Sequence, residues 1–304
     1  MPNAINRTRL SIFLALLILP SLLSAGELDR TPGLRKLTDD CYVYLHTDDR
    51  PGVSSTFNSG VIVTNEGVVV IDALGSVEIA RRVREAVSTV TSKPVRFLIT
   101  TTPHRPFTGG NAVYADTFRI AQENTREDLV KLLEKSPADE RSKELPHLTF
   151  REETTLHLGG KEIRILFPGR GHTRSDTIVF LPRDRLVYMG ETFYCDEFPY
   201  ISSGYSADWI QTIEAAEKLA ASIFIPGHGF LPWDLKATRA ELGNHRQVLK
   251  DVRDAVEAQV KKGVSEDQAL AAVDLPQFKK YKGYQRALEI AVRRIYRELT
   301  GAVR

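Results

Sequence analysis

Three histidines and one glutamate lie in short segments that also carry glycine or proline, residues that favour turns. These four residues are His104 after Pro103, His172 after Gly171, Glu191 after Gly190 and His228 after Gly227. Imidazole and carboxylate groups are ligands that zinc favours, and three histidines with one carboxylate suffice for one transition metal. Hydrogen bonds could satisfy the same side chains without a metal. A mononuclear metal site and a metal-free pocket therefore both stay open.

Five segments resemble, in order, the motifs of the metallo-β-lactamase superfamily. They are Val70-Ile71-Asp72, the loop 99–111, the segment Pro168 to Asp176 with Gly171-His172-Thr173, the strand end Tyr188-Met189-Gly190-Glu191, and Ile225-Pro226-Gly227-His228-Gly229. The resemblance extends from about Tyr42 to Pro232. It implies an α/β fold, the metallo-β-lactamase αββα sandwich, in which two sheets pack face to face with helices outside. It also implies a hydrolase.

The loop 99–111 departs from the family pattern H-x-H-x-D-H. In the overlay, Thr102 takes the place of the first histidine, Pro106 that of the aspartate and Phe107 that of the third histidine, while His104 is retained. The following Thr108-Gly109-Gly110-Asn111 is intact. Proline and phenylalanine carry no ligand atom in their side chains, and a neutral threonine is a poor zinc ligand.

The resemblance implies that His104 and His172 serve the first metal of the family site. It implies further that Glu191 replaces a bridging aspartate and that His228 serves the second metal. Because so many ligands are missing, we do not expect a dinuclear site. We predict at most one zinc ion, with His104, His172, Glu191 and His228 as candidate ligands.

Two functions follow, and the sequence does not decide between them. In the first, the protein is a hydrolase in which one metal activates water for attack on an ester, thioester or amide-like bond, and Glu191 ligates the metal or accepts the water's proton. In the second, it is a non-catalytic ligand-binding pseudoenzyme of the same fold, in which Arg105, Arg170 and Arg174 attract an anionic group. Either way the partner is a small-molecule substrate or ligand.

The remaining reactive residue types give weaker signals. His46, His147, His157 and His245 show no ligand-like spacing and are interpreted as ordinary surface or core histidines. No G-x-S-x-G, P-loop or C-x-x-C pattern occurs, which argues against a serine hydrolase, a nucleotide-binding protein and a thiol-redox protein. The two cysteines, Cys41 and Cys195, could pair or remain separate buried thiols.

Residues 1–25 have the order of a secretory signal peptide. Arg7 and Arg9 precede an apolar run, Leu10 to Leu23, which Pro20 interrupts and small residues follow. The run is shorter than the roughly 20 unbroken apolar residues of a membrane span, and no lipobox cysteine follows. We therefore predict a periplasmic or secreted protein without a stable membrane anchor.

Charge gives no reason to expect a polyanionic partner. Cleavage after residue 25 would remove two of the 41 basic residues and no acid, leaving 39 basic residues against 39 acidic ones. A balanced chain has no electrostatic drive towards nucleic acid or an anionic membrane. We expect neither as a partner.

The resemblance implies a metallo-β-lactamase-like domain, 30–234, and the change to helical spacing from Leu235 predicts a C-terminal helical extension, 235–304. Strands are predicted over 41–45, 59–64, 68–72, 95–100, 118–121, 153–158, 162–167, 177–181, 186–189 and 222–225. Helices are predicted over 77–90, from Asn124 with a capping box to Glu127, from a Ser206 cap, over 235–261, from a Ser265–Gln268 capping box, and over 284–299. The extension carries no chemical motif, so we interpret it as a packing appendage or the interface of a homodimer rather than a substrate lid.

Overall fold

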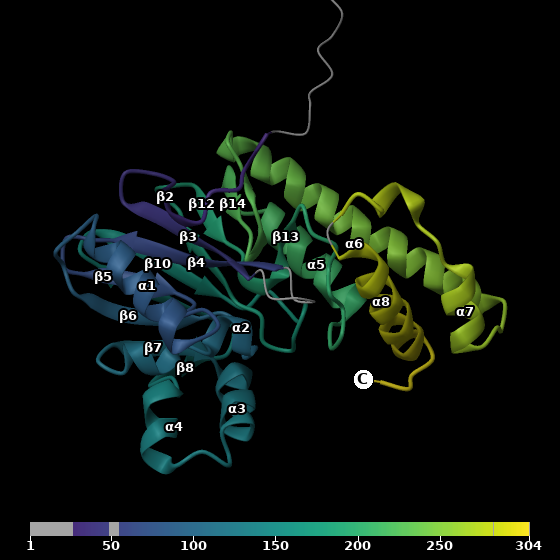
Figure 1. The fold of residues 1–304 in the computed structure, drawn as a ribbon, viewed down its shortest axis with the longest axis horizontal. Coiled ribbons are helices and arrows are strands. Elements are labelled where there is room, and N and C mark those ends of the chain that lie inside the picture. Colours follow the sequence, from purple (N-terminus) through teal and green to yellow (C-terminus); the bar gives the residue numbers. More distant parts are fainter. Residues whose placement is uncertain (1–26, 49–54, 282, 304) are drawn as a thin grey trace, which may run out of the picture.

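The computed structural model describes residues 27–48, 55–281 and 283–303. Two β-sheets pack face to face, and helices cover their outer faces (Figure 1). The predicted αββα sandwich with a C-terminal helical region is therefore confirmed. Isoleucine, leucine and valine side chains fill the space between the two sheets, with Ile62, Ile163 and Ile225 among them.

The first sheet has the order β13-β15-β4-β5-β6-β7-β8, with β3 and β2 added beside β4. Its strands are β2 Gly33–Lys36, β3 Cys41–Asp48, β4 Ser55–Val63, β5 Val68–Ile71, β6 Val95–Thr100, β7 Phe118–Gln122, β8 Leu148–Phe150, β13 Tyr194–Cys195 and β15 His228–Gly229. The run from β5 to β8 is parallel. The carboxyl ends of these strands consequently meet at one edge, where loops can build a site.

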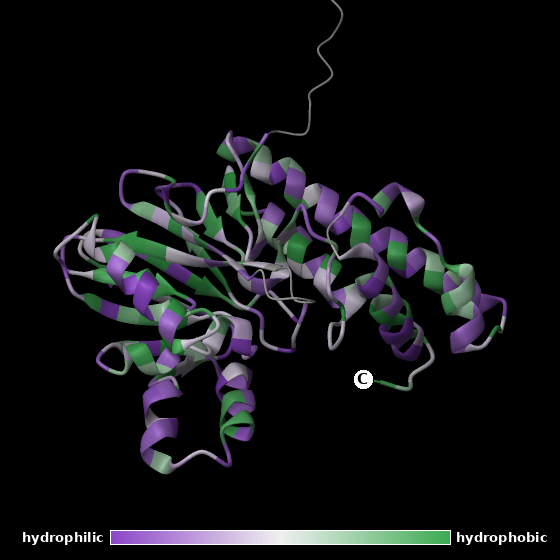
Figure 2. Cartoon of the chain, viewed as in Figure 1, coloured by the Kyte–Doolittle hydropathy of each residue, from purple (hydrophilic) through white to green (hydrophobic). Residues whose placement is uncertain are grey.

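The second sheet has the order β14-β12-β11-β10-β9. Its strands are β9 Glu153–Leu158, β10 Lys161–Leu166, β11 Ile178–Leu181, β12 Leu186–Tyr188 and β14 Ile223–Ile225. A short pair, β1 Leu28–Asp29 with β16 Leu231–Pro232, lies apart from both sheets. Hydrophobic residues concentrate on the strands, whereas the helices alternate between hydrophobic and hydrophilic residues (Figure 2).

Helices cover the sheets on both outer faces. On the first sheet lies α1 Val77–Ser88, whose Ala80 and Val87 pack against Val68 and Val70 of β5. On the second lie α5 Ser206–Glu217 and α6 Thr238–Lys261, which pack against each other and around Phe224 of β14. Three more helices lie near the carboxyl edge of the first sheet: α2 Arg105–Thr108, α3 Glu123–Leu132 and α4 Ala138–Glu144. Short 3-10 helices span 111–114, 190–192, 235–237 and 276–278.

The C-terminal helices share a core with the rest of the chain. Besides α6 they are α7 Glu266–Ala272 and α8 Tyr284–Leu299. Val252 of α6 and Val292 of α8 belong to the same buried cluster as Trp209 of α5 and Phe193 beside the second sheet. The apolar faces of α6 and α8 are thus covered by this chain itself.

Three predicted helix starts have different outcomes. The Ser265–Gln268 capping box is confirmed, with both reciprocal hydrogen bonds present. The predicted Asn124 cap is wrong, because the side chain of Gln122 accepts the Asn124 N–H and α3 begins at Glu123. The predicted Ser206 cap is also wrong: the Ser206 hydroxyl donates to Glu298 of α8 and so ties α5 to the C-terminal helix.

The two cysteines do not pair. Cys41 and Cys195 are both free and buried, and they lie in different hydrophobic clusters. Among the helices of residues 27–48, 55–281 and 283–303, none is long and apolar enough to cross a membrane. The predicted signal peptide lies outside the described residues.

Candidate metal centre

Four loops bring the predicted site residues to one point. Thr102 and His104 follow β6, His172 lies between β10 and β11, Glu191 follows β12, and His228 begins β15 after β14. The strands that precede these residues are largely buried, so their ends limit the positions that the following residues can take. The resulting cluster has Glu191 at its centre.

The carboxylate of Glu191 contacts every other predicted ligand. Its Oε2 accepts a hydrogen bond from Thr102 Oγ1 at 2.7 Å and lies 2.9 Å from His104 Nδ1. Its Oε1 lies 3.4 Å from His172 Nε2 and 3.5 Å from His228 Nε2. Histidines from three separate loops therefore converge on one carboxylate, as the sequence predicted.

Burial and charge shift the pKa values of His104 and His172, the two histidines beside Glu191, in opposite directions. Glu191 is only 4% exposed. Burial would raise its pKa, but the charge and the hydrogen bond of the His104 imidazole outweigh burial and hold it well below its ordinary value. Burial lowers the pKa of His172 to about 3, whereas Glu191 overcomes burial at His104 and raises that pKa to about 9. His172 is thus held neutral, the form in which imidazole binds metals, whereas His104 is protonated at neutral pH and has to release a proton to bind one.

The donor set fits one zinc ion. One nitrogen each of His104 and His172 and one oxygen of Glu191 lie within 4.8 Å of one another, and no other such group occurs in the described part of the chain. Three nitrogen and oxygen donors with an open fourth position are the arrangement of catalytic zinc sites. The His104 side chain is 33% exposed, so the cluster is open to solvent on that side. His228 lies beside this three-residue group rather than within it.

Phe107, which the motif overlay aligns with the third histidine, packs against His228. Its side chain is fully buried and makes edge-on contacts with His228, at 5.2 Å between ring centroids, and with Phe57 at 5.9 Å. Pro106 is the second residue of the short helix α2, and the Thr102 hydroxyl donates to Glu191. The rings of Phe57 and Phe107 thus both contact the His228 ring.

Buried aspartates hold two of the loops in place. Asp72, in a left-handed conformation after β5, accepts hydrogen bonds from the backbone N–H and the hydroxyl of Thr101. Asp176 accepts from the backbone N–H and the hydroxyl of Thr173, beside His172. Burial raises the pKa of both aspartates to about 7. Gly190 is required for a different reason: its φ is +52°, and a Cβ there would lie 2.5 Å from Thr101 Oγ1.

An aromatic wall behind the histidines was missed from the sequence. Tyr194 places its hydroxyl 3.2 Å from His172 Nδ1 and stacks on His228. Trp209 of α5 makes an edge-on contact with His172, and the ring of His245 of α6 lies nearly parallel to that of Tyr194. The position of Tyr194, three residues after Glu191, was the available signal. His245 gave none, because it sits on a helix face far along the chain.

A cavity of about 460 Å³ opens beside His104. Its lining mixes apolar, hydroxyl and charged side chains: Pro103, His104, Arg105, Asp128, Leu132, Thr173, Arg174, Ser203 and Tyr205. This composition suits a small molecule with both apolar and polar parts.

The three arginines proposed to attract an anion are all paired with carboxylates. Arg105 contacts Glu144 at 2.6 Å, Arg170 contacts Asp208 at 2.6 Å, and Arg174 contacts Asp128 at 2.7 Å. Arg174 also reaches Glu127. None offers an uncompensated charge, so the predicted anion-attracting cluster loses its electrostatic basis.

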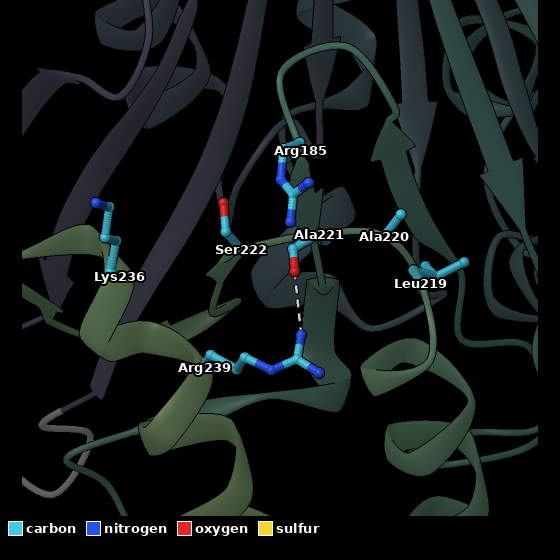
Figure 3. Close-up of a pocket in the computed structure, with 7 residues that line it drawn as sticks. All are labelled: Arg185, Leu219, Ala220, Ala221, Ser222, Lys236 and Arg239. Carbon is cyan, nitrogen blue, oxygen red and sulfur yellow. Dashed lines mark hydrogen bonds between the residues drawn. The ribbon is translucent and has the colours of Figure 1, made fainter.

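A second pocket, of about 440 Å³, lacks the groups for such chemistry. It is lined by Arg185, Leu219, Ala220, Ala221, Ser222, Lys236 and Arg239 (Figure 3). The Arg239 guanidinium donates to the backbone carbonyl groups of Ala221 and Glu217, so the role of Arg239 is structural. No histidine, cysteine or carboxylate lines this pocket, so it provides neither a metal ligand nor a general base.

Sequence comparison finds a family model that spans all four candidate ligands. Residues 57–228 match the family model of the metallo-beta-lactamase superfamily. The chain is 23% identical over 200 residues to "Metallo-beta-lactamase type 2" of Elizabethkingia meningoseptica, covering 64% of this chain and 78% of that protein.

Two solved structures show a similar fold. A metallo-beta-lactamase from Pontibacter korlensis superimposes with a TM-score of 0.58 at 22% identity, covering 72% of this chain and all of that one. The stereoselective inverting sec-alkylsulfatase Pisa1 from Pseudomonas sp. superimposes with a TM-score of 0.72 at 17% identity, covering 90% of this chain and 51% of that one. The match to the sec-alkylsulfatase thus covers more of this chain than the match to the metallo-beta-lactamase from Pontibacter korlensis.

Proposed function

The chain belongs to the metallo-beta-lactamase superfamily, and from that premise we propose that it is a hydrolase with one zinc ion held by His104, His172 and Glu191. The observation that carries the proposal is the convergence of these three ligand atoms beside an open cavity. Bound zinc supplies an activated water and polarises the bond to be cleaved. The proposed substrates are small molecules with an ester, thioester or amide-like bond.

The chain's own residues supply orientation and charge. Thr102 donates to Glu191 Oε2, which fixes the plane of the carboxylate. His228 lies against Oε1 of the same carboxylate, and we assign it to the same centre as a neighbour that can complete the ligand set. The solvent-accessible His104 faces the cavity in which substrate would bind, and Leu132 and Tyr205 offer that substrate apolar contacts.

One observation favours the alternative, a non-catalytic ligand-binding protein with this fold. The Glu191 carboxylate already has hydrogen-bond partners in Thr102 and His104, so the buried charge is compensated by the protein alone. A pseudoenzyme would keep this network for stability and bind a ligand in the adjacent cavity. The requirement for zinc separates the two functions.

Hydrolysis should depend on zinc. Protein freed of metal by a chelator is expected to be inactive on a panel of ester, thioester, β-lactam and sulfate-ester substrates, and addition of one zinc equivalent should restore turnover on at least one class. A His172→Ala variant should not be restored, because its metal ligand is lost. Turnover that is equal with and without zinc would contradict the proposal, and the absence of turnover together with binding of a substrate analogue would favour the pseudoenzyme.

We further propose that the protein is exported without a stable anchor. Expression of the full chain should give a product in the periplasmic or secreted fraction whose N-terminus lies near Gly26 or Glu27, because the apolar run of residues 10–23 precedes small residues suited to cleavage. N-terminal sequencing of the fractionated protein checks this. A membrane-bound product that begins at Met1 would refute cleavage.

A further inference from the structure

We propose that Tyr194 is a positioning residue of the metal centre, which holds the ring orientations of His172 and His228 by a hydrogen bond to His172 Nδ1 and by stacking on His228. This inference deepens the proposed function and rests on it where zinc is concerned. Tyr194 lies in β13, which pairs in parallel with β15, and its register partner there is His228. The backbone therefore places the two rings side by side.

Tyr194 contacts His172 through its hydroxyl. The oxygen lies 3.2 Å from His172 Nδ1, and both side chains are buried. The other ring nitrogen, Nε2, lies 3.4 Å from Glu191 Oε1. His172 is therefore held at both ends, by a neutral phenol at Nδ1 and by a carboxylate at Nε2.

Two histidine rings lie nearly parallel to the Tyr194 ring. Its centroid lies 4.1 Å from that of His228 with an interplanar angle of 13°, and 5.7 Å from that of His245 with an angle of 15°. His245 comes from α6. The C-terminal region thus contributes a side chain to the support of the candidate ligands, and the buried Tyr194 ring is packed between elements that hold its hydroxyl beside His172.

The phenol suits this position because a hydroxyl can both donate and accept. When Nε2 of a histidine binds a metal, Nδ1 carries the proton and needs an acceptor, and such outer partners set the tautomer and ring orientation of the ligand. Tyr194 Oη lies within hydrogen-bond distance of His172 Nδ1 and can accept that hydrogen bond. If Nε2 instead carries the proton and donates to Glu191, the same hydroxyl donates to Nδ1.

The test compares two buried tyrosines. Tyr194→Phe removes only the hydroxyl and keeps the stacked ring. Tyr188→Phe is the matched control, because the Tyr188 hydroxyl is also buried but donates to the backbone carbonyl of Tyr42. Both variants should unfold at similar urea concentrations.

Zinc affinity, measured by competition with a chromophoric chelator, is expected to fall about 10–100-fold in Tyr194→Phe, the range measured for lost outer partners of metal ligands. In Tyr188→Phe it should stay at the wild-type value. An unchanged affinity in Tyr194→Phe would overturn the inference while leaving the proposed function intact.

A readout without metal keeps the two proposals separable. In ¹⁵N-histidine-labelled protein, the ring-nitrogen shifts of His172 report its tautomer. Tyr194→Phe should move them in the metal-free protein, and Tyr188→Phe should not. If the wild type binds no zinc, the proposed function fails, and these shifts alone decide whether Tyr194 positions His172: a change supports the role and unchanged shifts refute it.

Discussion

A variant with Thr102→His, Pro106→Asp and Phe107→His is expected to bind close to two zinc ions per chain, where the wild type binds one. At two of these three positions, the present side chain already points towards the candidate metal centre. The Thr102 hydroxyl contacts Glu191, and the Phe107 ring contacts His228. Imidazoles at 102 and 107 would therefore point at residues that already lie in the centre. Zinc titration followed by native mass spectrometry counts the ions.

Two features oppose this gain. Pro103 restricts the backbone of residue 102, and Phe107 is a fully buried part of a small cluster with Phe57, Leu74 and Val83. Truncation of such a ring to alanine costs about 3–5 kcal/mol. The matched control is therefore Thr102→Ser with Pro106→Ala and Phe107→Leu, which disturbs the same loop without adding ligands and should still bind one zinc. A triple variant that folds, as judged by circular dichroism, but gains no zinc would show that the overlay on the family motif is wrong.

Glu191→Gln is expected to lower the affinity for zinc strongly while the protein stays folded. A neutral amide is a poor substitute for a carboxylate at a zinc site. Since loss of a mere outer partner costs 10–100-fold, the loss of this ligand should weaken binding on the order of 100-fold or more. Stability should fall as well, by about 1–3 kcal/mol in urea unfolding, because the charged acceptor of the Thr102 and His104 hydrogen bonds is gone.

The control for that variant is Glu197→Gln. Glu197 is also buried and accepts a backbone hydrogen bond, from Thr56, but it lies outside the group of converging ligand atoms. Its change should lower stability without changing the zinc count. Equal zinc affinity in Glu191→Gln and wild type would remove Glu191 from the metal centre.

The sequence predicted the features that depend on local pattern. The hairpin of β4 and β5, the strand β6 and the helix α8 were predicted within a few residues, because period-two and period-3.6 patterns and turn residues are local signals. The convergence of His104, His172, Glu191 and His228 was inferred from motif order. That inference succeeded because each residue stands at a strand end or a tight turn.

Contacts between distant segments could not be read from the sequence. Ser206 was expected to cap its own helix, but Glu298 lies close enough to accept its hydroxyl. Arg174 was expected to offer a free charge, but Asp128 of α3 neutralises it. His245 stacks on Tyr194 only because α6 packs against β13. In each case the deciding partner comes from another element, so no local pattern marks it.

The zinc content of the wild-type protein tests the central claim most directly. Protein purified without chelator, loaded with excess zinc and then freed of unbound metal should carry one equivalent by elemental analysis. His172→Ala, prepared in the same way, should carry none, because it removes one of the three converging ligands. Two equivalents in the wild type, or one that persists in His172→Ala, would contradict a single zinc held by His104, His172 and Glu191.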